Sequence, residues 1–302
     1  MIAPQPAKSR AAIGGVITTD LAMLLVVLIW GANFSIVKIA LAQIPPLAFV
    51  ALRFGIASVS LALLLRLREG PMRLPPGSLW KLVWLGVIGN TVYQVLFILG
   101  LSMTTAANSA LILATTPVMV AMMGGLLGLE RVTRHVALGI ALALCGITLV
   151  MASRGLTLSR QTLRGDLLVL AGVVCWTVYI LGIRALGSGF STLRITTLTM
   201  LTGTPGLLLV GSHQILSLGW GQIGFGAWLG LAYSSLLALV LSYVLYNSSI
   251  RLVGGSKTAI YSCVTPVVAV LVAWPMLGER PVPLQGVGTL LIIGGVLLTR
   301  RA

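Results

Sequence analysis

The chain has 302 residues, of which 58% are hydrophobic and only 8% charged, and its mean hydropathy is +1.06. Because soluble globular domains carry about 25% charged residues, this composition excludes a soluble protein and indicates a bundle of membrane-spanning helices. The net charge of +15 does not indicate nucleic-acid binding, since lysines and arginines lie in short stretches between apolar runs, where they orient spans.

Ten apolar runs approach or exceed the ~20 residues that a helix needs to cross the hydrocarbon layer. Their ranges are Asp20–Leu41, Leu47–Leu65, Leu79–Leu101, Ala106–Leu129, Arg134–Met151, Gly165–Leu186, Leu193–Val210, Gln222–Asn247, Ser256–Leu277 and Val282–Leu298. With the N-terminus in the cytoplasm, the cytoplasmic segments hold 14 lysines and arginines and the outer loops hold four. This bias predicts a multi-pass protein with both termini in the cytoplasm.

The second half of the chain repeats the first. The Asp, Trp and basic residue of the first span recur 146 residues later in the sixth, and the Thr-Pro pair of the fourth recurs 149 residues later in the ninth. The matching residues are Asp20, Trp30, Lys38, Thr116 and Pro117 with Asp166, Trp176, Arg184, Thr265 and Pro266. Five spans per half is an odd number, so the second half must cross the membrane in the opposite sense. The sequence therefore predicts an all-α integral membrane protein of two inverted five-helix repeats, residues 1–153 and 154–302, around a central cavity. Such repeats are typical of secondary transporters.

Aromatic and amide side chains within the spans are the candidate substrate-binding residues. Trp30 and Asn33 share one helix face, and Trp176 and Tyr179 are their counterparts in the second half. The third and eighth spans add further rings and amides, a combination that suits an amphipathic organic solute. Packing or an interfacial belt is the alternative for the rings. The full candidate set is Trp30, Asn33, Tyr93, Gln94, Phe97, Asn108, Thr116, Trp176, Tyr179, Tyr243, Tyr246, Asn247 and Ser262.

The two Thr-Pro pairs predict kinks inside the fourth and ninth helices, with Pro117 and Pro266 as hinge residues. A static packing kink is the alternative. Asn108 and its counterpart Lys257 are placed to contact a carboxylate, although Lys257 also fits the cytoplasmic headgroups. Arg53 lies about seven residues into the second span. It either reaches outward or pairs with an acid, an amide or a substrate carboxylate.

The carboxylates lie at helix ends or in loops, and Asp20 and Asp166 are expected to open their helices, where an acid complements the helix dipole. A mid-membrane proton relay is therefore not visible, which favours facilitated diffusion or coupling through an end-of-helix acid.

Two histidines and three intramembrane cysteines predict no metal site, and no enzyme motif or cofactor is expected. Glycines spaced seven apart, Gly139 with Gly146 and Gly288 with Gly295, predict close helix packing, either within a monomer or in a dimer.

Three stretches resemble the drug/metabolite transporter superfamily, and its EamA-type branch in particular. They are Trp30-Gly31, Ala51-Leu52-Arg53-Phe54 and the run from Thr-Pro to Glu-Arg in each half, where the second copy departs by adding Pro275. Overall similarity is greatest to the aromatic amino-acid exporters of bacterial inner membranes.

The resemblance implies a cavity framed by helices three, four, eight and nine, with helices one, two, six and seven moving. It also implies an exporter of aromatic and other apolar amino acids in the lipid bilayer of a bacterial inner membrane, and the missing mid-membrane acid makes facilitative export the expectation. A broad metabolite or drug exporter with proton antiport is the alternative, followed by a channel or scaffold.

Overall fold

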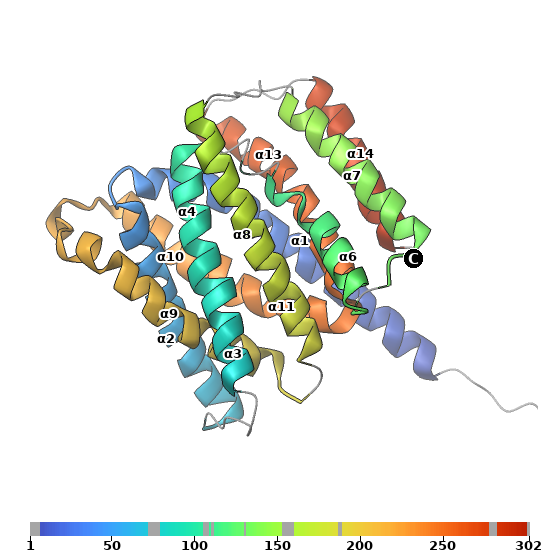
Figure 1. Cartoon of the computed structure of the whole chain (residues 1–302), viewed down its shortest axis with the longest axis horizontal. Helices are drawn as coiled ribbons and strands as arrows, with labels where there is room; N and C mark the ends of the chain where they lie inside the picture. Colours follow the sequence, from blue (N-terminus) through green and yellow to red (C-terminus); the bar gives the residue numbers. More distant parts are fainter. Residues whose placement is uncertain are drawn as a thin grey trace, which may run out of the picture.

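The computed structural model describes residues 7–71, 79–104, 109, 112–129, 131–152, 160–186, 189–277 and 283–300, and all regular structure in these ranges is helical (Figure 1). The first half comprises α1 (Ala7–Leu41), α2 (Pro46–Glu69), α3 (Leu79–Gly86), η1 (Val87–Val92), α4 (Tyr93–Met103), α6 (Thr116–Leu126) and α7 (Arg134–Ala152). The second comprises α8 (Arg160–Ala185), α9 (Thr192–Leu216), η2 (Trp220–Gln222), α10 (Phe225–Ser235), η3 (Leu236–Leu241), α11 (Ser242–Val253), α12 (Gly255–Ala259), η4 (Ile260–Val264), α13 (Thr265–Leu277) and α14 (Pro283–Arg300). The boundary between residues 153 and 154 lies outside the described residues.

Six helical stretches are long and apolar enough to cross a membrane: Thr19–Leu41, Pro46–Glu69, Leu79–Met103, Leu163–Ala185, Thr192–Leu216 and Phe225–Val253. They coincide with the first, second, third, sixth, seventh and eighth predicted spans. Shorter apolar helices occupy Thr116–Leu126, Arg134–Gly146 and Gly286–Leu298. The chain is thus a multi-pass membrane protein, and the total of ten crossings remains a prediction.

The order of elements repeats along the chain. The third and eighth spans each contain a six-residue π-helix, η1 and η3, and these begin 149 residues apart. Helices α6 and α13 begin 149 residues apart as well, whereas α2 and α9 begin 146 apart. These offsets equal those of the sequence repeat, so corresponding elements of the two halves share both position and local geometry.

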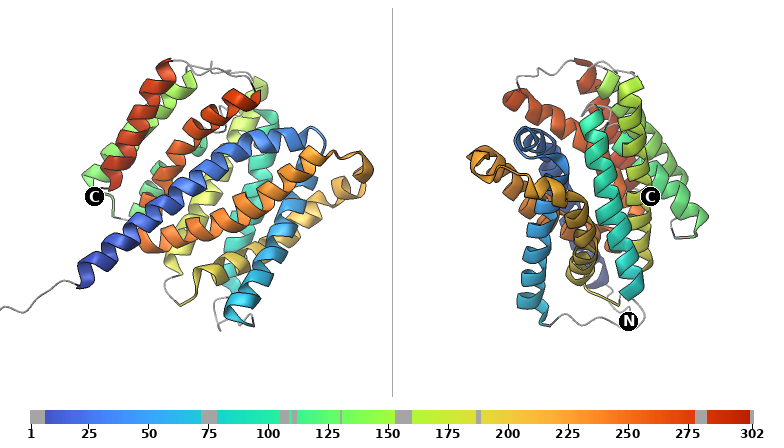
Figure 2. Two further views of the ribbon diagram at one scale, coloured as in Figure 1. Left: turned by 180° about the vertical axis from the view of Figure 1, so that it is seen from behind. Right: turned by 60° about the vertical axis from the view of Figure 1, so that its left-hand side comes forward.

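The last helices of the two halves, α7 and α14, lie side by side at one edge of the bundle (Figures 1 and 2). A Cβ on Gly146 would lie 2.5 Å from the carbonyl oxygen of Gly288, and a Cβ on Gly295 would lie 2.5 Å from that of Gly139. Each contact is the repeat counterpart of the other, as in two halves related by an approximate two-fold axis. The glycine seam therefore serves packing within one chain.

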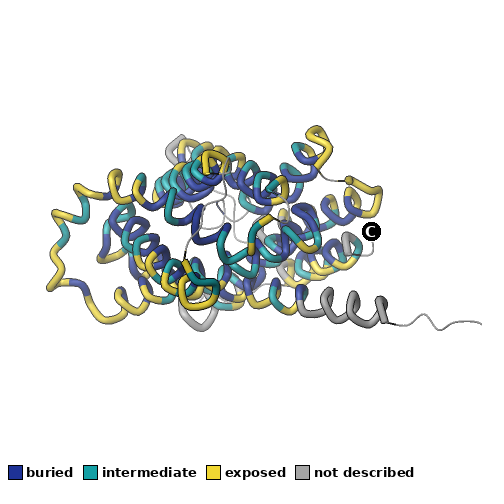
Figure 3. Tube along the Cα trace, turned by 90° about the horizontal axis from the view of Figure 1, so that it is seen from below, coloured by how far each residue is buried: buried dark blue, intermediate teal, exposed yellow. Residues whose placement is uncertain are grey.

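Residues that touch their own repeat counterparts mark this axis, because only positions beside a two-fold axis can do so. Such pairs include Trp30 with Trp176 (ring centroids 6.4 Å apart), Ser58 with Thr204 (2.6 Å), Gln94 with Tyr243 (3.2 Å) and Ala114 with Cys263 (3.8 Å). The pairs come from the first four spans of each half, so the axis passes through the middle of the bundle. Figure 3 shows buried residues mainly along the inner sides of the helices around it.

Two sequence predictions about helix geometry were wrong. The Thr-Pro pairs do not lie inside α-helices: α6 begins at Thr116 and α13 at Thr265, after a turn in the first half and the 3₁₀ segment η4 in the second. Proline is favoured in a first helical turn because its missing N–H has no intrahelical partner there. Asp20 and Asp166 do not open their helices either, since α1 begins at Ala7 and α8 at Arg160.

The described carboxylates have partners within the chain. Tyr261 donates a hydrogen bond to Asp20, and Thr104 donates one to Asp166 at 2.6 Å. Glu69 forms an ion pair with Arg194 at 3.3 Å. Glu130 and Glu279 lie outside the described residues. Each of the three described acids thus connects two parts of the chain that are far apart in sequence.

Candidate functional site

A cavity of about 110 Å³ lies on the two-fold axis between the halves. Nine of the thirteen predicted site residues line it: Trp30, Asn33, Tyr93, Gln94, Phe97, Thr116, Trp176, Tyr243 and Ser262. The predicted hinge residue Pro266 lines it too, whereas Pro117 is buried away from it. The structure therefore brings together residues from α1, α4, α6, α8, α11, η4 and α13.

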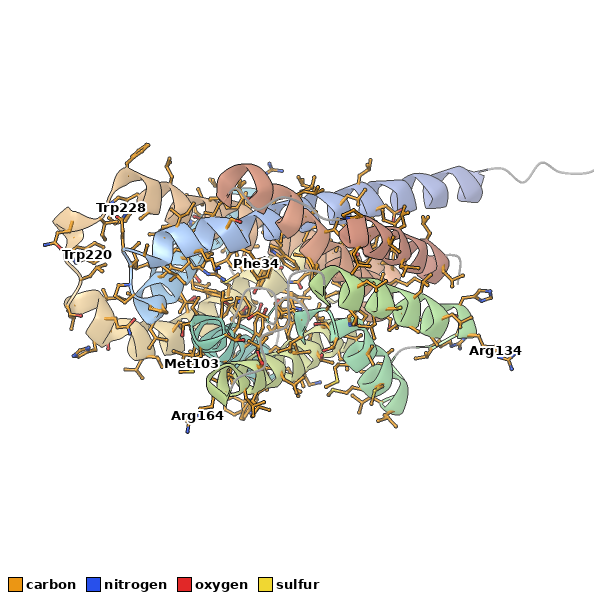
Figure 4. The ribbon with its side chains drawn as sticks, turned by 90° about the horizontal axis from the view of Figure 1, so that it is seen from above. Phe34, Met103, Arg134, Arg164, Trp220 and Trp228 are labelled. Atoms are coloured by element: carbon orange, nitrogen blue, oxygen red, sulfur yellow. The ribbon has the colours of Figure 1, made fainter. Side chains whose placement is uncertain are left out.

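Eight further lining residues were not in the candidate set: Phe34, Val37, Arg53, Leu101, Leu113, Ala238, Leu239 and Thr265. Of these, the sequence had singled out Arg53 as a candidate partner of a substrate carboxylate and Thr265 as part of a Thr-Pro pair. Phe34 follows Asn33 and lies one helical turn from Trp30, so the spacing could have indicated it. The aliphatic residues carry no signal, because each looks like any lipid-facing or core residue. The lining also includes α1, α2 and α8, which the family resemblance assigned to the moving helices and not to the cavity frame. Figure 4 shows Phe34 inside the bundle, while Trp220, Trp228 and Arg134 lie at its periphery.

Eight rings form one aromatic cluster: Trp30, Phe34, Tyr93, Phe97, Trp176, Tyr179, Tyr243 and Tyr246. Trp176 lies at its centre, stacked against Tyr93 and Tyr179 with centroids 5.0 Å away in both cases. Ring pairs in such geometries contribute roughly 0.5–1.5 kcal/mol each beyond their area burial. The cluster therefore gives the cavity a rigid wall that presents ring faces and edges to an apolar group.

Trp30 and Asn33 also tie the first half to the eighth span of the second. The indole N–H of Trp30 donates to the carbonyl oxygen of Ala238 at 2.9 Å, inside the π-helix η3. Asn33 accepts a hydrogen bond from Ser234 at 2.6 Å. A π-helix offsets the backbone ladder by one residue and frees such carbonyl groups for other donors. These contacts fix the orientation of α1 beside the cavity.

Arg53 is the one charged residue among the described cavity-lining residues. It is only 5% exposed, and its guanidinium lies 5.8 Å from the ring of Phe49 and 5.6 Å from that of Phe54. Its Nη2 donates to Oε1 of Gln94 at 2.9 Å, and Nε2 of Gln94 donates to the hydroxyl of Tyr243 at 3.2 Å. Since a guanidinium only donates, the amide oxygen must face Arg53, which turns the amide nitrogen toward Tyr243. A polar chain thus runs from α2 through α4 to α11.

Three predicted site residues do not line the cavity. Tyr179 and Tyr246 are fully buried in the aromatic cluster, behind Trp176 and Trp30. Asn247 is fully buried as well and donates to the Tyr179 hydroxyl at 2.8 Å and to Thr196 at 2.9 Å. The side-chain nitrogen of Asn247 and the hydroxyl of Tyr179 therefore serve contacts between helices in this conformation, whereas the buried hydroxyl of Tyr246 has no hydrogen-bond partner in the described structure. Asn108 lies outside the described residues.

The two halves of the chain contribute unequally to the wall of the cavity. Its first-half wall contains Asn33, Phe34, Phe97 and Leu101. Their repeat counterparts Tyr179, Ile180, Tyr246 and Ile250 are all 0% exposed. Equivalent surfaces of the two halves are thus open on one side of the axis and closed on the other. The buried positions of Tyr179 and Tyr246 follow from this asymmetry, since each is the counterpart of a lining residue.

Comparison with known proteins gives the same picture of a doubled chain. The model of the EamA-like transporter family matches residues 17–152 and again residues 163–301. The uncharacterized transporter YyaM of Bacillus subtilis is 31% identical over 273 residues, covering 88% of this chain and 88% of the relative. The "probable terminal-alkyne amino-acid exporter" of Streptantibioticus cattleyicolor is 29% identical over 284 residues, covering 93% of this chain and 92% of the relative.

One solved crystal structure superimposes with a TM-score of 0.78, covering 94% of this chain and 98% of its own at 19% sequence identity. At that identity, the likeness concerns the fold alone.

Proposed function

The chain belongs to the EamA-like transporter family, and from that premise we propose that it exports amino acids with aromatic or other apolar side chains across a bacterial inner membrane. The observation that carries this proposal is the cavity on the two-fold axis, walled by Trp30, Tyr93, Phe97, Trp176 and Tyr243. Clustered rings favour an apolar or aromatic side chain, while amides and hydroxyls beside them suit a polar α-carbon. One relative bears the name of an amino-acid exporter, which supports the same class of substrate.

Transport proceeds by alternating access between two inverted halves. The inequality of the cavity supports this, because exchanging the conformations of the halves would close the wall at Phe34 and open the wall at Ile180. With both termini in the cytoplasm, as the lysine and arginine distribution predicts, α1 runs outward from Asp20. Phe34 and Val37 then lie on the outer half of α1, so the described conformation faces outward. In this scheme the predicted hinges Pro117 and Pro266 begin the helices that border the cavity.

The runner-up is a broad metabolite or drug exporter driven by proton antiport. A cationic drug is best recognised by a buried acid, and a proton-coupled carrier places a titratable acid in the membrane. Among the described lining residues there is an arginine and no carboxylate. The charge of the cavity thus favours an amino acid over a cation, and facilitated export over a proton relay in the cavity.

Purified protein in proteoliposomes tests this function. We expect saturable flux of labelled phenylalanine, tryptophan and leucine. Unlabelled tryptophan and leucine should inhibit the flux of phenylalanine, and a dicationic drug should show no flux. An imposed pH gradient should change the rate little and should not drive accumulation. The absence of saturable amino-acid flux would overturn the proposal, and accumulation against a gradient would replace facilitated export by proton antiport.

A further inference from the structure

We propose that Arg53 is the carboxylate-binding residue of the cavity, so that the ligand is an organic acid or zwitterion whose carboxylate pairs with the guanidinium. This deepens the proposed function and rests on it for the location of the site. Amino-acid export by itself does not say which residue meets the carboxylate.

The first argument is the charge balance of the buried arginine. Arg53 is 5% exposed and lines the cavity, yet no described carboxylate is paired with it. The described acids Asp20, Glu69 and Asp166 have Tyr261, Arg194 and Thr104 as partners. A charge removed from water is destabilising by several kcal/mol unless a counter-charge and hydrogen bonds compensate for it. An anionic ligand would supply the missing counter-charge.

The second argument is the unfilled donor capacity of the guanidinium. Nη2 donates to the neutral amide oxygen of Gln94, whereas Nε is buried and has no hydrogen-bond partner in the described structure. A guanidinium has five N–H donors in a planar fork, and a carboxylate accepts two of them in parallel. The rings of Phe49 and Phe54 flank the group but accept no conventional hydrogen bond. The geometry leaves donors for a carboxylate oxygen.

The rest of the cavity fits the other parts of such a ligand. Thr265 lines the cavity, and its buried hydroxyl has no partner in the described structure. A hydroxyl oxygen there can accept from an α-ammonium group. The aromatic cluster provides the surface for an apolar side chain. Because Gln94 joins Arg53 to Tyr243 of the other half, a carboxylate on Arg53 also acts on a contact between the halves.

Equilibrium binding to purified protein tests the assignment with three probes of one shape: phenylalanine, 3-phenylpropanoate and 2-phenylethylamine. The wild-type chain should bind the two probes that carry a carboxylate, phenylalanine and 3-phenylpropanoate. It should bind the amine, 2-phenylethylamine, far more weakly. Arg53→Gln should weaken the binding of phenylalanine and of 3-phenylpropanoate by roughly 30-fold or more, as expected when one partner of a buried charge pair is removed, and leave the binding of the amine unchanged. Arg53→Lys should retain part of the affinity. Arg66→Gln, a change at an exposed arginine that does not line the cavity, is the matched control and should change nothing.

A second variant keeps the test decisive if Arg53→Gln fails to fold. Gln94→Glu places a carboxylate beside the guanidinium, so it should exclude both carboxylate probes while keeping the thermal unfolding temperature at or above that of the wild type. Unchanged carboxylate affinity in Gln94→Glu, equal losses for all three probes in a folded Arg53→Gln, or a wild-type chain that binds neither carboxylate would overturn the assignment.

Failure of this assignment can be distinguished from failure of the proposed function. If the wild type binds 3-phenylpropanoate through Arg53 but neither binds nor transports phenylalanine, amino-acid export is wrong and the assignment holds. If phenylalanine is transported equally well by wild type and Arg53→Gln, export holds and the assignment is wrong.

Discussion

Asn247 shows how a single buried amide holds three helices together beside the cavity. It lies on α11, and its side-chain nitrogen donates to Tyr179 on α8 and to Thr196 on α9. All three residues are fully buried. We expect Asn247→Ala to lower the free energy of unfolding by roughly 1–3 kcal/mol, because it leaves two hydroxyl groups without their buried partner. Thermal and denaturant unfolding in detergent measures this change.

The matched control is Tyr179→Phe, which removes only one of the two partners. Its effect should be smaller, and the double variant should lose less than the sum of the two single losses, because the two changes share one hydrogen bond. Additive losses would show that the bond between Asn247 and Tyr179 contributes nothing to stability. Ser212→Ala, at an exposed position, should leave unfolding unchanged.

At this scale the sequence indicates which residue types are buried but not how they pair. Helical spacing placed Trp30 with Asn33 and Tyr93 with Phe97, and the structure has all four on the cavity wall. Helical spacing could not predict the hydrogen bond between Arg53 and Gln94, because these residues are 41 positions apart and on different helices. The rotation of one helix against another determines such a contact, and local periodicity does not contain it.

Among the elements, α7 and α14 depend on the absence of side chains along their seam. A Cβ on Gly146 would lie 2.5 Å from the Gly288 carbonyl oxygen and 2.8 Å from the backbone nitrogen of Ile292. Backbone atoms cannot turn aside as a flexible side chain can. We therefore expect Gly146→Ala to separate the two helices and to destabilise the protein by roughly 1–3 kcal/mol.

Gly286→Ala provides the comparison in α14, since no atom lies within 4 Å of the added Cβ. Alanine is favoured over glycine in a helix by up to about 1 kcal/mol, so this variant should be neutral or stabilised. The thermal unfolding temperature should therefore fall in Gly146→Ala and stay the same or rise in Gly286→Ala. Equal temperatures would mean that the seam tolerates a methyl group and that close backbone contact is not what joins the helices.

Element positions were largely predictable, and element irregularities were not. Apolar length located the six stretches that qualify as spans, because the bilayer fixes how long a helix must be. The π-helices η1 and η3 left no such mark, since neither contains proline and each extra residue is accommodated by the surrounding packing. The Thr-Pro pairs marked the correct places, but the distortion precedes the proline and the α-helix starts there.

For the whole molecule, alternating access predicts that reactivity moves from one wall of the cavity to the other. In a background without Cys145, Cys175 and Cys263, Phe34→Cys should react quickly with a hydrophilic thiol reagent. Ile180→Cys, at its fully buried counterpart, should react roughly ten- to a thousandfold more slowly, since minor conformers are ~0.1–10% populated. The rates at which the thiol reagent modifies the two variants are measured in right-side-out and in inside-out vesicles.

Adding a transported amino acid should raise the rate at which the reagent modifies Ile180→Cys from the cytoplasmic face. Phe34→Cys should remain accessible only from outside. Ile250→Cys should behave like Ile180→Cys, because Ile250 is the buried counterpart of the lining residue Leu101. Reaction of both walls from the same face would contradict the exchange of halves and would instead fit a channel.

Differences in sequence between repeat counterparts determine which of these two conformations is preferred. If the halves were identical in sequence, the inward and outward conformations would be copies of one another with the same free energy. An identical pair such as Trp30 and Trp176 then favours neither conformation through its own chemistry, however strongly it stabilises the fold. Any preference must arise where counterparts differ, as they do at Asn33 and Tyr179 or at Phe97 and Tyr246. A difference of only about 1.4 kcal/mol changes the ratio of the two populations tenfold, so we expect a single substitution at an unlike pair to shift the balance between the two conformations.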